Sequence, residues 1–583
     1  MTILTGHRPT RALIYFGLLV LSYGLILQNE LIGDDMGRIV NNPELNNLIS
    51  ALTGKLGDRP LLMFFLWIQV TVLGLGSLGL HVANLIWHTL VADQLAQLVD
   101  ESGEKSSGKV TVAFAAGLLF ALHPLHSQSI NIVVQSGAIM AALFGIISLR
   151  YFLKAKFLLS FGALCLGMLC KPTISFLPLL YLISPTILGE THRKKWRWFP
   201  LFILPALFPV IFYAVFNQNR QDLYAMEPWR YFFTQMEVIF TYLRLMVAPL
   251  GLKYLYDFTS PEKLWPNLGW AYLAIYLVCI PLITLSLKEK IPRFLFIGFC
   301  LSFLPESSFF PIIHTAFEHR TYVPLLLIFA TLGSWWNPKV LPRSAVITIS
   351  LIALIYLGIN QMRNFQIRTK LDWMSHTLKN SVSHHNFNYG FNVQLAQAGR
   401  FEEVHQNIAR YKKIHEESVH NLILEDIVLY SEKPDQRKAI AERLEKIVLH
   451  PWEGHTPRLD ANWVLIGEFG HKSASLEDLL RLEEDLSVQM RIFFESHMNH
   501  YFLPLAARYP DIVARIFERE AEVRALKKDI ELLKMKTILF YYYARPSGTI
   551  REEILTRLER DPSSPVLLRL KEMTEQSRRA PSP

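Results

Sequence analysis

The sequence predicts an all-α protein in two parts, a polytopic membrane body over residues 1–362 and a soluble helical domain over residues 363–583. Hydrophobic residues make up 51% of the chain, and its mean hydropathy is +0.23, which is too apolar for an ordinary soluble protein. Apolar blocks of roughly 17 to 22 residues, the length that crosses a bilayer, recur up to about residue 361. After Arg363 the sequence is polar and helix-forming, and it is long enough there for a separate core.

The first predicted span covers residues 11–27 and follows a short basic segment. A basic front before an apolar stretch also fits a signal peptide, but residues 28–30 (Gln-Asn-Glu) offer no small-residue cleavage site. We therefore expect a retained span with its N-terminus in the cytoplasm. The polar segment 34–58 then lies on the outer side of the membrane.

The other spans are predicted from apolar blocks that alternate in direction. They cover residues 80–98, 110–122, 130–149, 157–169, 174–188, 199–216, 268–287, 294–304, 323–336 and 345–359. Residues 61–73 and 231–250 are interpreted instead as helices on the outer surface. A span at 231–250 would place the basic residues of 288–293 outside, against the positive-inside rule. This alternation gives about eleven spans and an external C-terminal domain.

The charge and the cysteines argue against a nucleic-acid-binding protein and against a disulfide-stabilised protein. The net charge is +9, but much of the positive charge lies in short loops between spans, where membrane topology accounts for it. We therefore do not expect nucleic-acid binding. The four cysteines all fall inside apolar blocks, so they predict packing residues and no disulfide framework.

The C-terminal domain contains one stretch that is typical of a tetratricopeptide helix pair. In residues 386–411, two helical patterns flank Gly399 and Arg400. Asn392 and Val404 stand where small residues are usual in such repeats. Later helical patterns at 475–491 and 511–534 have apolar faces without a clear repeat.

Asp34 and Asp35 are the candidate catalytic residues. They follow the first span directly, where a carboxylate can reach both a lipid-borne phosphate and a water-soluble hydroxyl. Transfer of a sugar from a lipid phosphate needs a base for the attacking hydroxyl and positive charge for the departing phosphate. A neighbouring like charge would raise the pKa of one of the two carboxyls towards a useful range. The alternative is a helix cap or turn pair, and the spacing leaves open which aspartate is the base.

Arg320, Lys171 and Arg59 are the candidate phosphate ligands, because all three are predicted at outer ends of spans. Arginine binds phosphate through two parallel hydrogen bonds and keeps its charge. Glu318, in the same loop as Arg320, is assigned to this donor site as well. The alternative for the basic residues is interfacial snorkelling.

Five polar residues are candidates for acceptor binding or for structural hydrogen bonding. His81, Asn84 and His88 share one face of a predicted span, but the two histidines lie roughly 10 Å apart along the helix axis, too far to share a metal. Hydrogen bonds between helices are the favoured interpretation, although polar groups within spans often mark function. His123 and His126 lie where an acceptor would enter and could chelate a metal, but the sequence places no third ligand near them, so a divalent metal is possible but not favoured.

An ordered series of motifs resembles one enzyme family. The series is Asp34-Asp35 with Asn41-Asn42-Pro43, Arg59-Pro60-Leu61, His81 with Asn84 and His88, residues 121–126 (Ala-Leu-His-Pro-Leu-His), residues 318–324 (Glu-His-Arg-Thr-Tyr-Val-Pro), Trp373, and residues 399–403 (Gly-Arg-Phe-Glu-Glu). It resembles the membrane O-mannosyltransferases that carry tetratricopeptide repeats and their bacterial relatives, within the GT-C glycosyltransferase superfamily. The resemblance covers roughly residues 10–410.

The resemblance implies a GT-C-like body in which an acidic residue of the first external loop acts as the base. It also implies a donor sugar on a polyprenyl-phosphate carrier and an acceptor hydroxyl at the outer or lumenal face. This sequence departs from the family pattern at Gln128 and Ser136, where an acid and an arginine are frequent. It departs again at Pro172, which follows Lys171 where an acid is common.

The sequence therefore predicts a multi-pass glycosyltransferase of a bacterial inner membrane, with the C-terminal domain in the periplasm. Its expected partners are the bilayer, a polyprenyl-phosphate-linked sugar and a protein acceptor, the last held by the tetratricopeptide-like domain. No cofactor is expected beyond the donor substrate. The alternatives are a lipid or cell-wall glycan as acceptor, or a catalytically silent scaffold that binds partners through its helical domain. A transporter is disfavoured because no paired broken spans are visible.

Overall fold

The computed structural model divides the chain into two compact units, Met1–Ser381 and Val382–Pro583. The described residues are 8–40, 42–53, 59–102, 111–194, 198–203, 205, 227–256, 258, 260–265, 267–312, 315–336, 341–381, 388, 391–392, 394–396, 398–413, 425–426, 428–429, 432–436, 439–440, 443, 555–556 and 559. Every regular element among them is helical, as predicted.

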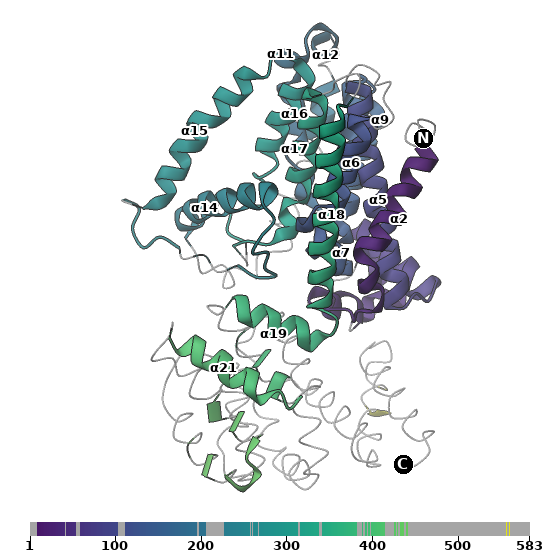
Figure 1. Ribbon diagram of the computed structural model, residues 1–583. Coiled ribbons are helices and arrows are strands. Elements are labelled where there is room, and N and C mark those ends of the chain that lie inside the picture. The colour runs from purple at the N-terminus through teal and green to yellow at the C-terminus, as the bar shows by residue number, and fades with distance from the viewer. Residues whose placement is uncertain are drawn as a thin grey trace. The chain divides into compact units, whose positions relative to one another are not determined.

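The first unit is a bundle of long helices around a buried centre (Figure 1). Its long helices are α2 (Arg8–Tyr23), α5 (Ser77–Ser102), α6 (Val112–Leu122), α8 (Ser136–Leu153), α9 (Phe157–Cys170), α14 (Pro228–Val247), α15 (Leu268–Ser286), α16 (Lys290–Leu301), α17 (Tyr322–Trp335), α18 (Arg343–Phe365) and α19 (Lys370–Asn380). Helices α5, α6 and α8 form the interior of the bundle, and α17 packs against all three.

Short elements connect the long helices. They are η1 (Gly24–Gln28), η2 (Met36–Val40), η3 (Pro43–Asn46), α3 (Leu48–Thr53), α4 (Pro60–Trp67), η4 (Ile68–Val72), η5 (Pro124–His126), α7 (Ser127–Asn131), η6 (Val133–Gln135), η7 (Pro172–Ile174), α10 (Leu177–Leu182), α11 (Ser184–Leu188), α12 (Glu190–Lys194) and η10 (Glu318–Thr321). The predicted span 174–188 is broken in this way into η7, α10 and α11. Pro185 accounts for the second break, because proline cannot donate the backbone hydrogen bond that would continue α10.

The helices pack closely where side chains are small. Gly117 of α6 faces α2 and α5, and a Cβ atom at this position would lie 2.9 Å from the carbonyl oxygen of Ala92. The Tyr15 hydroxyl crosses the same contact and donates a hydrogen bond to the Phe114 carbonyl at 2.9 Å. Small residues of this kind let membrane helices gain van der Waals contact.

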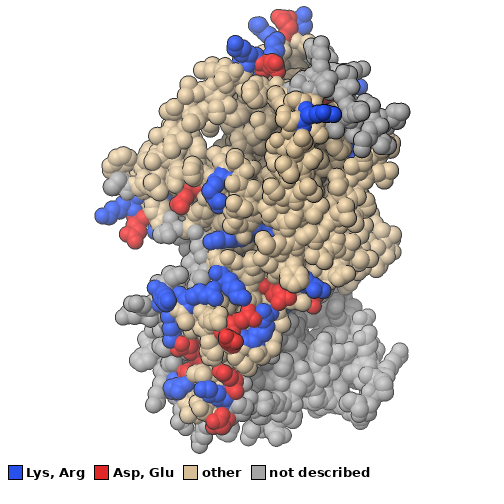
Figure 2. All heavy atoms as spheres, viewed as in Figure 1, with Lys and Arg blue, Asp and Glu red and all other residues tan. Residues whose placement is uncertain are grey.

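Four helical segments are long and apolar enough to cross a membrane: 9–28, 133–153, 268–286 and 343–365. Over the most apolar stretch of α15 and of α18 only 6% and 11% of the residues are buried, which suits helices that face lipid. Figure 2 agrees, because the first unit shows a broad surface without charges, and Lys and Arg side chains gather near α11 and α12. A membrane protein is therefore confirmed in outline.

Other predicted spans form helices at the expected places, such as α6 and α9, but these are shorter than a bilayer requires. The predicted span 199–216 lies almost entirely outside the described residues. The total of about eleven spans therefore stays a prediction. Both predicted surface helices exist, as α4 with η4 and as α14, and Figure 1 shows α14 lying across the direction of the long helices.

In the second unit the described residues include one helix pair at the predicted place. Helical residues among 388–396 precede Gly399, whose φ of +77° makes the turn, and α21 (Phe401–Lys412) follows. The Asn407 side chain donates a hydrogen bond to that of Asn392 at 3.1 Å, so an amide pair replaces the usual small-residue contact. The helices predicted at 475–491 and 511–534 lie outside the described residues, and the tetratricopeptide domain stays a prediction.

Candidate functional site

Five connections of the first unit bring six charged and polar side chains to one place. We call this group the charged cluster, and it consists of Asp34, Arg59, Gln135, Lys171, Glu306 and Arg320. The segments are connections between helices rather than parts of long helices. Four of the six residues, Asp34, Arg59, Lys171 and Arg320, were candidates from the sequence.

The two aspartates point in different directions because of the turn before them. Gly33 has a φ of +59°, a left-handed conformation that glycine adopts without strain. After this turn the Asp34 side chain is exposed and the Asp35 side chain is buried. Trp373 of α19 covers the turn from the other side and packs with a small apolar group that includes Ile32 and Ile132.

Asp35 is an anchor for the segment that leads into α8. Its two carboxylate oxygens accept hydrogen bonds from the backbone N–H groups of Val133 and Val134, at 2.9 and 2.8 Å. Burial raises the pKa of the Asp35 carboxyl to about 7, and the two backbone donors act against this shift. The side chain is fully buried, so Asp35 holds η6 in place and has no exposed oxygen for a substrate.

Asp34 is the accessible carboxylate of the pair. It accepts a hydrogen bond from the Gln135 amide at 3.3 Å, and its negative charge acts on Lys171. The side chain is otherwise open to solvent. Of the two aspartates, Asp34 therefore has the position that a base for an incoming hydroxyl requires.

Lys171 lies at the centre of the charged cluster. It follows α9 directly, and its amino group is 3.5 Å from the side-chain oxygen of Gln135 and 3.7 Å from the Glu306 carboxylate. Burial lowers the pKa of Lys171 to about 8; Glu306 raises it again, while Arg59 and Arg320 lower it. Arg59 belongs to the same electrostatic environment and immediately precedes α4.

Arg320 and Glu306 complete the charged cluster. The Arg320 Nε atom is 3.6 Å from the Glu306 carboxylate, and an Nη atom donates a hydrogen bond to the Thr315 carbonyl at 3.1 Å. The guanidinium also lies over the ring of Phe317. The cluster thus holds three cationic side chains against two carboxylates, and this excess of positive charge suits a phosphate group.

Glu318 lies two positions before Arg320 in the sequence but belongs to a different group of side chains. It is fully buried and forms an ion pair with Arg363 of α18 at 2.9 Å. The same carboxylate accepts hydrogen bonds from the Tyr256 hydroxyl and the Lys253 backbone N–H, at 2.8 and 2.7 Å. Burial raises the pKa of Glu318, and Arg363 opposes the shift. Glu318 therefore ties η10 to α18 and does not join the charged cluster.

The residues of the predicted polar face on α5 lie inside the bundle. His88 contacts the Tyr322 hydroxyl at 2.5 Å and the Ala121 carbonyl at 2.9 Å. Asn84 donates to the Ile130 carbonyl at 3.2 Å, so it holds the same connection that Asp35 anchors. His81 is fully buried as well. The contacts of His88 and Asn84 suit the interpretation of hydrogen bonding between segments, whereas neither ring nitrogen of His81 has a hydrogen-bond partner among the described residues.

His123 and His126 are also buried. His123 contacts the Met246 carbonyl at 3.1 Å, and the ring of His126 packs against those of Phe120 and Tyr322. Burial lowers the pKa of His123 to about 4. Within the part of the chain that the structure describes, no three His, Cys, Asp or Glu side chains are placed to hold a metal ion.

Three residues of the site were not found from the sequence. Gln135 and Glu306 join the charged cluster, and Arg363 pairs with Glu318. A signal existed for Gln135, because it lies in a row of polar residues with Gln128 and Asn131 next to an apolar stretch. Glu306 carried no such signal, since a single acid in a loop is ordinary.

The resembled family often has an acid at the position of Gln128. The side-chain amide of Gln128 both donates and accepts a hydrogen bond. It donates a hydrogen bond to the Tyr254 carbonyl at 3.0 Å and accepts one from the His319 backbone N–H at 2.9 Å. An ionised acid could only accept hydrogen bonds. The substitution therefore fits a structural role for this side chain, which connects α7 to η10 and to the segment around Tyr254.

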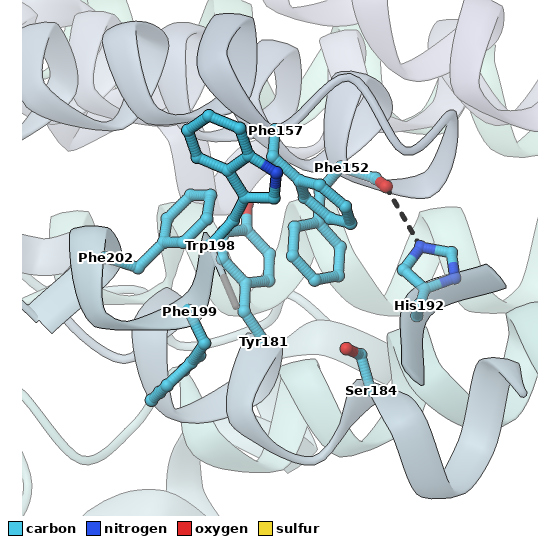
Figure 3. A pocket seen from close by; sticks show the side chains of 8 residues that line it. All are labelled: Phe152, Phe157, Tyr181, Ser184, His192, Trp198, Phe199 and Phe202. Atoms are coloured by element: carbon cyan, nitrogen blue, oxygen red, sulfur yellow. Dashed lines mark hydrogen bonds between the residues drawn. The ribbon is translucent and has the colours of Figure 1, made fainter. Parts of the chain in front are cut away.

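A cavity lined by aromatic residues lies away from the charged cluster, among α8, α9 and the segments from α10 onwards (Figure 3). Its lining residues are Phe152, Phe157, Tyr181, Ser184, His192, Trp198, Phe199 and Phe202. The rings of Phe152 and Tyr181 stack at 3.8 Å, and His192 contacts the Phe152 carbonyl at 3.1 Å. None of the described residues that line this cavity is a lysine or an arginine, whereas the charged cluster holds three cationic side chains.

Comparison with known proteins finds protein O-mannosyl-transferases. The chain is 30% identical to the human protein O-mannosyl-transferase TMTC1 over 139 residues. This alignment covers 21% of this chain and 15% of the human protein. Over 159 residues it is 26% identical to a protein O-mannosyl-transferase of Caenorhabditis elegans, with 25% of this chain and 23% of that protein aligned. The mouse TMTC1 is 29% identical over 180 residues, 28% of this chain and 18% of the mouse protein.

These alignments span less than a quarter of the length of the relatives. No family model matches the chain, and no solved structure matches it either. The resemblance predicted from the motifs is therefore confirmed as a distant and partial similarity to the protein O-mannosyl-transferases.

Proposed function

We propose that this chain is an integral-membrane glycosyltransferase that moves a sugar from a polyprenyl-phosphate carrier to an acceptor hydroxyl on a protein, at the periplasmic face. The observation that carries the proposal is the charged cluster, in which an exposed carboxylate, Asp34, lies beside Lys171 and Arg320. The partial similarity to protein O-mannosyl-transferases supports the same reaction class.

The proposed chemistry assigns different roles to the acid and to the cations. The acceptor hydroxyl oxygen attacks the anomeric carbon of the sugar, and Asp34 takes the hydroxyl proton. The bond from that carbon to the phosphate oxygen breaks, and its electron pair leaves with the phosphate. Lys171, Arg320 and Arg59 stabilise the negative charge that develops there. Asp35 is a positioning residue, because it holds the segment that carries Gln135.

The proposal includes the organisation predicted from the sequence. The membrane body is residues 1–362 with about eleven spans, and residues 363–583 form a tetratricopeptide-like domain that presents a surface to the protein acceptor. The proposal also includes a cytoplasmic N-terminus, which the distribution of basic loops supports, and a location in the inner membrane.

The experiment compares sugar transfer by membranes that contain the full chain or single variants. With a radiolabelled polyprenyl-phosphate sugar, Asp34→Asn should lower the transfer rate about 10²- to 10⁴-fold, the usual contribution of a general base. Arg320→Gln should lower it about 10²- to 10³-fold through the loss of phosphate stabilisation. Glu190→Gln is the matched control, since this carboxylate is 74% exposed and pairs with Lys194, and it should transfer at the wild-type rate. Wild-type transfer by Asp34→Asn would refute the proposed function.

A further inference from the structure

The Glu306 carboxylate lies between two cations of the charged cluster and is held weakly by both. Its oxygens are 3.7 Å from the Lys171 amino group and 3.6 Å from Arg320 Nε. Both distances allow ionic attraction, but both are too long for a hydrogen bond. In contrast, the carboxylate of Glu318 accepts hydrogen bonds of 2.7 to 2.9 Å from three different residues. Of these two acids, only Glu306 has contacts that can be exchanged at little cost.

The backbone of Glu306 is fixed, although its side chain is not. Its N–H donates to the Phe303 carbonyl at 3.3 Å, and its carbonyl accepts a hydrogen bond from the Tyr231 hydroxyl at 2.8 Å. The side chain is 18% exposed, so it can turn towards solvent without movement of the chain. A rotation of this one side chain would free the faces of Lys171 and Arg320 that the carboxylate now occupies.

We infer that Glu306 is the counter-ion of the donor site when no donor is bound, and that the donor phosphate displaces it. This inference rests on the proposed function, which assigns Lys171 and Arg320 to the phosphate. A carboxylate and a phosphate diester both carry one negative charge and two oxygens that can face a pair of cations. Because Glu306 already occupies the position between the two cations, a phosphate that contacts both must take its place. Glu306 is thus a positioning residue that keeps Lys171 and Arg320 aligned until the donor binds.

The test measures binding of farnesyl monophosphate to the full-length protein in detergent micelles, with farnesol as the neutral control. Glu306→Gln removes the competing charge, so it should tighten farnesyl monophosphate binding about two- to fivefold, the range expected for a partly exposed ion pair. Binding of farnesol should not change. Farnesyl monophosphate should also raise the melting temperature of Glu306→Gln more than that of the wild type.

Each outcome of this test decides one of the two proposals. If Glu306→Gln binds farnesyl monophosphate no more tightly than the wild type, while Lys171→Met and Arg320→Gln lose binding as expected, the counter-ion role alone is overturned. Unchanged binding in Lys171→Met and Arg320→Gln would overturn the phosphate site and with it the proposed function. An equal gain for farnesol would also overturn the counter-ion role.

A second variant keeps the test decisive if Glu306→Gln does not fold. Glu306→Asp keeps the charge but shortens the side chain, which withdraws the carboxylate from Lys171 and Arg320. Its farnesyl monophosphate binding should lie between those of the wild type and the expected Glu306→Gln value. Weaker binding than the wild type would overturn the inference.

Discussion

At the scale of single residues, Asp34 and Asp35 show how two adjacent carboxylates acquire different roles. The spacing in the sequence left both open as the base. The turn at Gly33 separates them, because it turns Asp35 inwards to two backbone donors and leaves Asp34 beside Gln135 and solvent. In the proposed reaction Asp34 is therefore the base, and Asp35 supports the segment 133–135.

The buried position of Asp35 predicts a pH dependence of stability. Its pKa is about 7 in the folded chain against an ordinary value of 3.8, so between these values the folded state binds more protons than the unfolded state. The free energy of unfolding should therefore fall as the pH rises from about 4 to about 7. Unfolding in detergent across this pH range measures the slope.

In Asp35→Asn the free energy of unfolding should no longer show this decrease between about pH 4 and about pH 7, because an amide does not titrate. Asp34→Asn is the control and should keep it. A slope that is the same in the wild type and in Asp35→Asn would show that Asp35 does not titrate as its burial implies.

At the scale of elements, the short helix η10 carries one structural residue, Glu318, and one residue of the proposed donor site, Arg320. Glu318 pairs with Arg363 in the interior, whereas Arg320, two positions later, contacts Glu306 of the charged cluster. Glu318→Ala leaves Arg363 buried without its partner, which should cost about 3–5 kcal/mol of unfolding free energy. Thermal or denaturant unfolding of the purified protein measures this loss.

Arg320→Lys should give the opposite pattern. It keeps the positive charge and most of the packing, so the unfolding free energy should change by less than about 1 kcal/mol. It loses the planar guanidinium, so sugar transfer should fall. If Arg320→Lys unfolded as easily as Glu318→Ala, the division of roles within η10 would be wrong.

Helices were predictable from the sequence where hydropathy alone defines them. The predicted blocks 110–122, 157–169 and 345–359 correspond closely to α6, α9 and α18. The block 174–188 was not predicted correctly as one helix, because hydropathy does not register the break at Pro185. The partners in the site were harder to predict, since Gln135, Lys171 and Glu306 meet only through the packing of α8, α9 and α16.

At the scale of the whole molecule, the remaining prediction is the orientation in the membrane. A broad uncharged surface with basic residues near α11 and α12 suits a cytoplasmic location for those two elements (Figure 2). A reporter enzyme that is active only in the periplasm, fused at Gly399, should therefore be active in a bacterial host.

The matched control for this fusion is the same reporter placed after Lys194, which should be inactive. The reverse result, an active reporter after Lys194 and an inactive one at Gly399, would invert the topology. It would also place Asp34 on the cytoplasmic side, away from the proposed acceptor.

The most direct measurement of the central claim is a cryo-electron microscopy structure of the full chain with a non-transferable polyprenyl-phosphonate sugar. We predict that the phosphonate contacts Lys171 and Arg320, that the sugar faces Asp34, and that the Glu306 carboxylate has turned away from the two cations. A phosphonate bound elsewhere, for example in the aromatic cavity around Phe152, would contradict the account.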